Sequence, residues 1–273
     1  MPYISGGKFV VIGGASLLGS HIGEQLLSGG AREVVLLDSL ALGATENIDF
    51  LLSDKRCTFI RGNALRLNEL YDPMDKADGF FAVAGFLGAP MNANPWLGID
   101  VNLRGLQKIL ESSRYQKVQK VVFSSSNGIY GAVGDEPNTD DSPLRWAGMP
   151  PALVLYCASK IMGEALGQLY HQNYGLGFLA LRYSAIYGER QHKRAVAGTQ
   201  MMQAYENIRS GNRPEIERDG TQVTDYIYAV YAARANLMAM ESQASGTGMN
   251  IVSGVDTSQN RVVELLSRPA RQI

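Results

Sequence analysis

Cysteine and histidine are scarce in this chain of 273 residues, which contains two cysteines and three histidines. The cysteines, Cys57 and Cys157, are a hundred residues apart, so we expect ordinary buried thiols and no disulfide framework. The histidines are scattered and match no metal-ligand spacing, so we expect no metal site. Neither a disulfide-stapled domain nor a zinc module is therefore indicated.

An excess of charge of either sign is also lacking. The net charge of −1 at pH 7 provides no electrostatic footprint for nucleic acid or for an anionic membrane. No apolar run approaches the roughly 20 residues needed to span a bilayer. Phe9 already belongs to a strand pattern, which leaves no room for a signal sequence. We expect a cytoplasmic protein that binds neither nucleic acid nor membranes.

Short apolar runs recur along the first two thirds of the chain, at 8–12, 33–37, 57–61, 79–83, 120–124 and 177–181. Each run is apolar on both alternating faces, which is typical of a strand buried between two layers of helices. Candidate helices lie between them at 17–28, 66–71, 98–113 and 157–174. This alternation predicts an α/β fold with a doubly wound parallel sheet of the Rossmann type.

The pattern changes after about residue 190. Helix patterns at 197–210 and 229–241 lie on either side of the polar stretch SGNRPEIERDG, which predicts a small C-terminal lobe at the carboxyl edge of the sheet. We therefore expect a domain over residues 1–190 and a smaller, partly interleaved lobe over 191–273. A last amphipathic helix, capped by Asp256, Thr257 or Ser258, starts close to the end of the chain. For this reason we expect the lobe to be truncated.

The segment KFVVIGGASLLGSHIGEQLL, residues 8 to 27, has the strand–turn–helix layout that binds dinucleotide phosphates. Gly13 and Gly14 follow the strand, and Gly19 lies where helix and strand pack closely. Ser16 replaces the middle glycine, and its hydroxyl could donate to a phosphate oxygen. The turn alone is equally compatible with a simple tight connection.

The second strand ends in EVVLLDSL, where Asp38 lies 19 residues after Gly19. This is close to the spacing of the carboxylate that accepts from adenosine ribose hydroxyls. No basic residue follows until Lys55, so nothing nearby would neutralise a 2′-phosphate. Together with the turn, Asp38 predicts a dinucleotide site that prefers NAD to NADP.

Tyr156 and Lys160 are four residues apart and therefore share one face of a helix. They follow VVFSSSNGIYG, a strand whose carboxyl end carries serines where open α/β sheets bind ligands. A phenol with a pKa near 10 is a poor base at neutral pH, but a nearby ammonium favours the phenolate. The pattern predicts a tyrosine acid/base assisted by a lysine and a serine hydroxyl.

As a set, these motifs resemble the extended short-chain dehydrogenase/reductases, in particular the NAD-dependent epimerase/dehydratase branch related to UDP-sugar 4-epimerases. The resemblance runs from about Phe9 to Ile251. IGGASLLGS resembles the family's TGxxGxxG turn, LLDSLALG its ribose-binding segment, and FSSSNGIYG with YCASK its catalytic signatures. It implies Ser126 as the substrate-orienting hydroxyl, Tyr156 as acid/base, and Lys160 as ribose anchor and pKa modifier.

Four more segments extend the resemblance: RGNALRL near adenine, AVAGFLGAP along the cofactor, DVNLRG with its asparagine, and LRYSAIYGERQ beside the nicotinamide. The cofactor-binding residues it implies are Gly13, Ser16, Leu17, Leu18, Gly19, Asp38, Ser39, Asn63, Ala64, Val83, Ala84, Gly85, Asn102, Ser124, Tyr156, Lys160, Ser184 and Ile186. The substrate-binding residues it implies are Phe86, Leu87, Ser126, Asn127, Ala185 and Arg190. It also implies NAD as cofactor, a small-molecule substrate for the lobe over 191–273, and a homodimer through helices 98–113 and 157–174.

The departures from the family pattern concern the substrate. Thr224 stands where nucleotide-sugar relatives carry an arginine that grips the substrate pyrophosphate, and Val230 with Tyr231 replaces an acidic pair. The loss of a charge-assisted contact to phosphate costs about 1.5–3 kcal/mol. Binding of a UDP-sugar would then need a substitute cation, for which the candidates are Arg190, Lys193 and Arg218.

We predict reversible hydride transfer between NAD and a substrate carbinol, on a sugar or nucleotide sugar. Epimerisation follows if NAD stays bound until the hydride returns, and dehydrogenation follows if NADH leaves. Two alternatives remain open at this point. Thr224 favours a dehydrogenase of a non-nucleotide alcohol, whereas Ser16 and the short C-terminus favour a non-catalytic NAD(H)-binding sensor.

Overall fold

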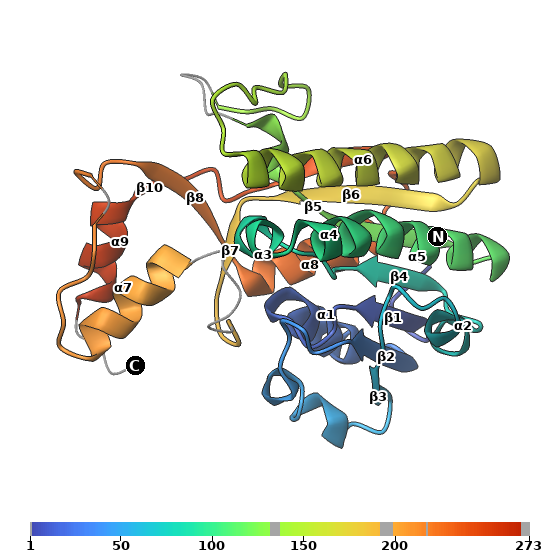
Figure 1. Cartoon of the computed structure of the whole chain (residues 1–273). Helices are drawn as coiled ribbons and strands as arrows, with labels where there is room; N and C mark the ends of the chain where they lie inside the picture. Colours follow the sequence, from blue (N-terminus) through green and yellow to red (C-terminus); the bar gives the residue numbers. More distant parts are fainter. Residues whose placement is uncertain (1, 132–136, 192–198, 217, 269–273) are drawn as a thin grey trace.

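A seven-stranded parallel sheet forms the centre of the molecule, which is described here by a computed structural model for residues 2–131, 137–191, 199–216 and 218–268 (Figure 1). The strands run in the order β3-β2-β1-β4-β5-β6-β9. Their bounds are β1 (Lys8–Ile12), β2 (Glu33–Asp38), β3 (Cys57–Arg61), β4 (Gly79–Ala82), β5 (Lys120–Ser126), β6 (Gly177–Tyr183) and β9 (Thr247–Ile251). The order reverses between β1 and β4, which opens a crevice at their carboxyl ends. The predicted Rossmann-type α/β fold is confirmed.

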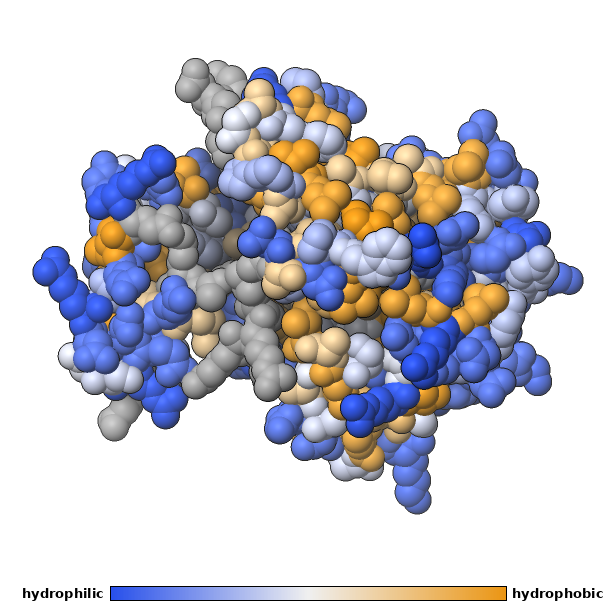
Figure 2. All heavy atoms as spheres, viewed as in Figure 1, coloured by the Kyte–Doolittle hydropathy of each residue, from blue (hydrophilic) through white to orange (hydrophobic). Residues whose placement is uncertain are grey.

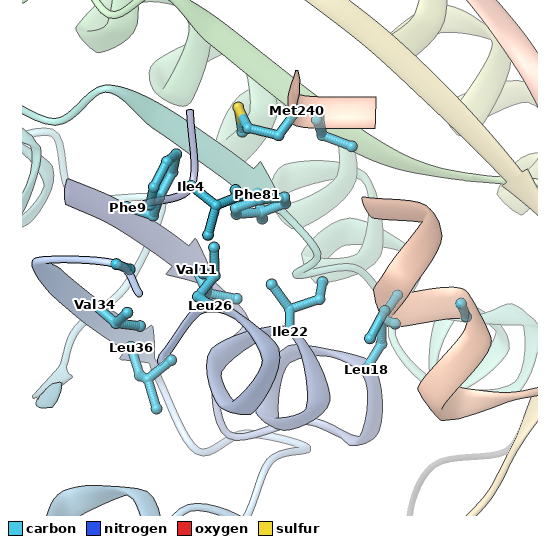
Figure 3. Close-up of a cluster of buried hydrophobic side chains, with 14 of the residues drawn as sticks. Ile4, Phe9, Val11, Leu18, Ile22, Leu26, Val34, Leu36, Phe81 and Met240 are labelled. Atoms are coloured by element: carbon cyan, nitrogen blue, oxygen red, sulfur yellow. The ribbon is translucent and has the colours of Figure 1, made fainter. Parts of the chain in front are cut away.

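Helices cover both faces of this sheet. On one face lie α1 (Leu17–Ser28) and α8 (Ala229–Glu241), and on the other lie α2 (Asn68–Met74), α5 (Leu106–Tyr115) and α6 (Pro151–Tyr174). Figure 3 shows the first interface, where Phe9 and Val11 of β1 meet Ile22 of α1 and Met240 of α8. The alternate strand residues, such as Val10, pack against the opposite helices. Because both faces are buried, the strands read as continuous apolar runs.

The predicted helix over 98–113 is divided into three parts. It begins as α4 (Pro95–Ile99), continues as a π-helical segment (Asp100–Gly105) and ends as α5; a short helix, α3 (Gly88–Ala93), precedes it. Short 3₁₀ turns lie at Thr45–Asn47, Leu51–Ser53 and Asn127–Tyr130. π-helical segments are uncommon and often lie at functional sites. The π segment carries Asn102, whose contacts are described below.

A second, smaller lobe lies beyond the carboxyl ends of the main strands (Figure 1). Its three-stranded sheet has the order β10-β8-β7, and two helices accompany it. The bounds are β7 (Ala185–Tyr187), β8 (Val223–Tyr228), β10 (Asp256–Ser258), α7 (Thr199–Arg209) and α9 (Gln259–Leu266). Of the three candidate caps, the Ser258 hydroxyl accepts the N–H of Arg261 at the start of α9.

The chain passes between the two lobes more than once. After β8 it returns to the main body as α8 and β9, and only then contributes β10 and α9 to the small lobe. A division into 1–190 and 191–273 therefore remains a proposal, in which the second part is interleaved with the first. None of the described helices is both long and apolar enough to cross a bilayer.

Candidate active site

The turn between β1 and α1 takes its shape from Gly13. This residue has φ +91°, and a Cβ there would lie 2.7 Å from the backbone nitrogen of Ala84. Ser16, in contrast, has an extended backbone that any residue can adopt (φ −84°, ψ 172°). A Cβ at Gly19 would lie 2.1 Å from the carbonyl oxygen of Gly13, so the helix can approach the strand only with glycine there.

The Ser16 hydroxyl is used inside the turn. It donates to the carbonyl oxygen of Gly13 at 2.7 Å and accepts the N–H of Gly19 at 3.1 Å, which caps α1. The expectation that this hydroxyl donates to a phosphate does not match these bonds. The N–H groups of Leu17 and Leu18 in the first turn have no acceptor within the helix and can serve an anion instead.

Asp38 joins the end of β2 to this turn. Its Oδ2 accepts the N–H of Ala15 at 3.0 Å and its Oδ1 accepts the N–H of Leu40 at 2.8 Å. The carboxyl group is buried, and burial raises its pKa, while these backbone bonds act in the opposite direction. A Cβ at Gly43 would lie 2.9 Å from Oδ2, so the loop after β2 closes over the carboxylate.

Two cavities lie side by side along the carboxyl edge of the sheet, and they share Ser16, Leu42, Val83 and Gly85. The smaller, of about 250 Å³, is lined by these predicted residues: Gly13, Ser16, Asp38, Ser39, Asn63, Ala64, Val83, Ala84, Gly85 and Phe86. The larger, of about 480 Å³, is lined by these: Ser16, Leu17, Leu18, Val83, Gly85, Leu87, Ser124, Ser126, Asn127, Tyr156, Lys160, Ser184, Ala185 and Ile186.

Two further predicted residues lie behind these walls. Gly19 belongs to the turn described above. Asn102, on the π segment, accepts the N–H of Phe86 at 2.7 Å and donates to the Phe86 carbonyl at 3.0 Å and to the Ser159 hydroxyl at 2.9 Å. It therefore clamps the segment after β4 to α6, and its three contacts are all within the protein.

The structure does not bring Arg190 to the larger cavity. Its guanidinium forms an ion pair with Glu24 of α1 and lies 4.4 Å from the centre of the Phe50 ring, and it lines a separate cavity beside His21. After β7 the chain folds back onto α1, and this path places Arg190 beside Glu24 instead of in the larger cavity. Arg218 is exposed and lines neither cavity, and Lys193 lies outside the described residues.

The three predicted catalytic side chains meet at one wall of the larger cavity. Lys160 is buried, and its Nζ donates to the Ser124 carbonyl at 2.7 Å and lies 5.8 Å from the centre of the Tyr156 ring. Burial raises the pKa of Tyr156 to about 12, although a hydrogen bond with Ser126 acts to lower it. Burial lowers the pKa of Lys160 to about 8, although the charge of Glu164 acts to raise it.

Several lining residues escaped the sequence analysis. They are Leu42, Gly88, Ser125, Leu153, Tyr183 and Gln191 in the larger cavity, together with Thr224, which the sequence analysis named only as a departure from the family pattern. Leu42 and Gln191 belong to LLDSLALG and LRYSAIYGERQ, two segments that resemble cofactor-binding segments of the family, so the resemblance could have indicated both residues. Leu153 was missed because α6 begins at Pro151, six residues before the predicted start.

The residues present fit a dinucleotide. A glycine at position 13 leaves room where a Cβ would fill the cradle, the start of α1 offers free N–H groups, and a buried carboxylate lies at the end of β2. A Cβ at Gly85 would lie 3.1 Å from the Lys160 Nζ, so glycine also keeps the passage to the lysine open. The fold and the cavities thus define an enzyme class that uses a nicotinamide dinucleotide, and Tyr156 and Lys160 remain the predicted catalytic pair.

The chain belongs to the NAD-dependent epimerase/dehydratase family, whose model matches residues 9–252. A curated relative, the putative UDP-glucose 4-epimerase of Methanocaldococcus jannaschii, is 31% identical over 94% of this chain and 80% of its own length. Two solved structures are also similar. The UDP-N-acetylglucosamine 4-epimerase from Methanobrevibacter ruminantium has a TM-score of 0.87 and 26% identity, covering 96% of this chain and 81% of its own.

The second structure is the UDP-glucose 4-epimerase of Thermus thermophilus, solved as a complex with NAD. It has a TM-score of 0.82 and 30% identity, and the match covers 95% of this chain and 82% of its own. The protein described here is accordingly an NAD-dependent enzyme of the short-chain dehydrogenase/reductase type.

Proposed function

We propose that this enzyme transfers hydride reversibly at a carbinol of a sugar, most simply a nucleotide sugar, with epimerisation as the outcome. The observation that carries the proposal is the convergence of Ser126, Tyr156 and Lys160 on the larger cavity, next to the smaller cavity that contains Asp38. The names of the three relatives reported above support it, because each is described as a UDP-sugar 4-epimerase, one of them as a putative one.

The cofactor roles follow from the two cavities. We assign the pyrophosphate to the N–H groups of Leu17 and Leu18 above Gly13, and the adenosine ribose to the carboxylate of Asp38. Asn63 and Ala64 line the smaller cavity, and we assign adenine to them, as the resemblance implies. When bound, NAD supplies the hydride acceptor, and in its reduced form the hydride donor. The Asp38 carboxylate would repel a 2′-phosphate, which favours NAD over NADP.

The proton is handled by the chain's own side chains. Ser126 holds the substrate oxygen, and Tyr156 takes the hydroxyl proton as the carbinol is oxidised and returns it when the ketone is reduced. In the free protein burial raises the pKa of this phenol to about 12, so positive charge close to it is needed. With a pKa of about 8, Lys160 is largely protonated at neutral pH and supplies part of that charge.

A dehydrogenase of a non-nucleotide alcohol is the second candidate. The supporting observation is Thr224 in the wall of the larger cavity, at the position expected for a phosphate-gripping cation. Within the described wall of that cavity, Lys160 is the one cationic side chain. A nucleotide sugar would therefore be held there by hydroxyl, amide and apolar groups, supplemented by any contacts from residues outside the described ranges.

One assay separates the two candidates. The protein is incubated with NAD and either UDP-sugars or simple alcohols, while the absorbance of NADH at about 340 nm and the configuration of the sugar are followed. A changed sugar without net NADH supports the epimerase. Net NADH from a simple alcohol supports the dehydrogenase and contradicts the proposal.

Tyr156→Phe is the first prediction. Loss of the acid/base should lower turnover by about 10²–10⁴-fold, while the dissociation constant for NAD measured by calorimetry should change by less than about twofold. Tyr170→Phe is the matched control, because Tyr170 lies on the same helix and its hydroxyl donates to Glu111 away from both cavities. Turnover at the wild-type rate in Tyr156→Phe would remove Tyr156 from the mechanism.

A further inference from the structure

Glu164 is a buried carboxylate on α6, one helical turn beyond Lys160, and all of its described contacts lie inside the protein. It is 3% exposed. Its Oε1 accepts the Ser125 hydroxyl and the Arg182 Nε, the latter at 3.0 Å, and its Oε2 accepts the Arg182 Nη2 at 2.7 Å. Ser125 on β5 and Arg182 on β6 are register partners, so both side chains point to the face covered by α6.

Stability alone does not explain this group. Removing a carboxylate and a guanidinium from water costs several kcal/mol per ion, and well-packed apolar replacements of such pairs are often neutral or stabilising. What a satisfied buried pair does provide is a fixed arrangement of the elements it joins. Here the elements are α6, which carries Tyr156 and Lys160, and the strand end that carries Ser126.

Glu164 holds the carboxyl end of β5 through Ser125, the middle one of its last three residues. Ser125 lies between Ser124, whose carbonyl accepts from Lys160, and Ser126, which lines the larger cavity with Tyr156 and acts to lower the pKa of its phenol. A displacement of Ser125 would therefore move both neighbours relative to α6. Arg182 extends the network outward, because its Nη1 donates to the Tyr130 hydroxyl at 2.7 Å and to the Asp140 carbonyl at 2.9 Å.

Glu164 also lies four residues after Lys160 on the same face of α6, and its negative charge acts to raise the pKa of Lys160. On α6 the titratable groups facing the ammonium are Tyr156 and Glu164. From β5 it meets the Phe123 ring and the Ser124 carbonyl, and after β4 it meets the backbone at Gly85. Arg182 of β6 is the positive charge behind Glu164, and it would be left uncompensated if the carboxylate were neutralised.

We propose that Glu164 is a positioning residue for hydride transfer: through Ser125 it fixes the strand end that carries Ser124 and Ser126, and its charge faces the Lys160 ammonium. The inference rests on the roles proposed above for Ser126, Tyr156 and Lys160. The two effects are separable, because Ser125→Ala removes the tether and keeps the charge, whereas Glu164→Gln keeps a carbonyl acceptor for Ser125 and removes the charge.

The first measurement uses the free protein and needs neither substrate nor cofactor. Lysine side chains are labelled with ¹³C, and the Lys160 signal, identified by its loss in Lys160→Met, is titrated between about pH 6 and 11. In Glu164→Gln the midpoint should fall by one pH unit or more relative to wild type. It should stay within about 0.3 units of wild type in Ser125→Ala and in the matched control Glu111→Gln, whose carboxylate pairs with Arg114. An unmoved midpoint in folded Glu164→Gln overturns the charge effect.

The second measurement is turnover with the nucleotide sugar and NAD. Both Ser125→Ala and Glu164→Gln should lose about tenfold or more in kcat with KM within about threefold, and Glu111→Gln should keep both values. If Glu164→Gln does not fold, Glu164→Asp takes its place: it should keep the Lys160 midpoint and lose kcat, because the shorter side chain no longer reaches Ser125. Wild-type kcat in Ser125→Ala overturns the tether.

Failure of the proposed function would look different. If the Lys160 midpoint shifts as expected but wild type turns over no nucleotide sugar, the substrate assignment is wrong and the charge effect stands. The tether is then judged from the turnover of the alcohol that the wild-type enzyme does accept.

Discussion

Ser16, in the turn between β1 and α1, stands where the family motif has glycine and has a different role from the one the motif suggests. The motif leads one to expect glycine at position 16, yet the backbone there is extended and needs no glycine. Gly13, with a positive φ and the backbone of Ala84 behind it, is the position that does. Ser16 instead caps α1, so its hydroxyl supports the helix whose N-terminus we assign to the pyrophosphate.

Ser16→Ala should therefore affect stability more than cofactor binding. Loss of the cap should lower the unfolding free energy by about 1 kcal/mol, whereas Ser16→Gly should cost only a few tenths. Chemical denaturation measures the difference, with Ser53→Ala as a control because Ser53 is exposed and bonds only within its own turn. In both Ser16 variants the NAD dissociation constant should stay within about threefold of wild type. A much larger loss would show that the hydroxyl itself holds the phosphate.

At the scale of elements, the π-helical segment before α5 has a definite task. It presents Asn102 to the backbone of Phe86 and to the hydroxyl of Ser159, and so links the chain after β4 to α6. That link borders both cavities, because Phe86 lines the smaller one and α6 supplies Tyr156 to the larger one.

Replacing Asn102 with leucine keeps the volume and removes three hydrogen bonds, two to the half-buried backbone of Phe86 and one to the buried Ser159 hydroxyl. We expect a loss of about 2–4 kcal/mol in unfolding free energy and an NAD dissociation constant at least tenfold higher. Gln107→Leu is the control, since Gln107 is exposed and lies in α5, directly after the π segment. If Asn102→Leu binds NAD as wild type does, the clamp is a matter of stability alone.

Elements that are buried on both faces could be predicted from the sequence, and those that depend on distant partners could not. β1, β4 and β5 begin where their apolar runs begin, because burial dictates their composition. β9, with the sequence TGMNI, is a half-buried edge strand that carries Asn250, and its pattern resembles a loop. The π segment has no composition signal. Neither does the pairing of Arg190 with Glu24, residues that lie far apart in the chain.

The residues proposed for catalysis show the same limit. The spacing of Tyr156 and Lys160 places them on one helix face, and that could be read directly. The contribution of Glu164 could not, because it depends on the register that sets Ser125 beside Arg182.

At the scale of the molecule, the two lobes are tied together by the path of the chain. Between β8 and β10 the chain returns to the main sheet as α8 and β9. Asp225 on β8 reinforces this connection, because its carboxylate accepts the N–H groups of Ser253 and Gly254 just after β9. The larger cavity is lined by both lobes, with Thr224 from the small lobe and Tyr156 from the main body. These connections therefore fix the position of one wall relative to the other.

The outer surface of α6 carries the last prediction. Met162 and Leu169 are seven residues apart on this helix and are 54% and 48% exposed, and Figure 2 shows apolar side chains gathered over α6 and the helices beside it.

We propose that a second copy of the chain covers this side, as the resemblance implies. Full burial of an exposed Leu or Met contributes about 1.5–3 kcal/mol, so each of these half-exposed side chains would contribute about 1 kcal/mol, which a charge in its place would remove. The wild-type chain should therefore sediment as a dimer, and Met162→Glu with Leu169→Glu as a folded monomer that still binds NAD. Met238→Glu on α8, which is 62% exposed, should leave the dimer intact. If the wild-type chain sediments as a monomer at micromolar concentration, the proposal is wrong. The apolar side chains on α6 are then exposed to water in the active form of the enzyme.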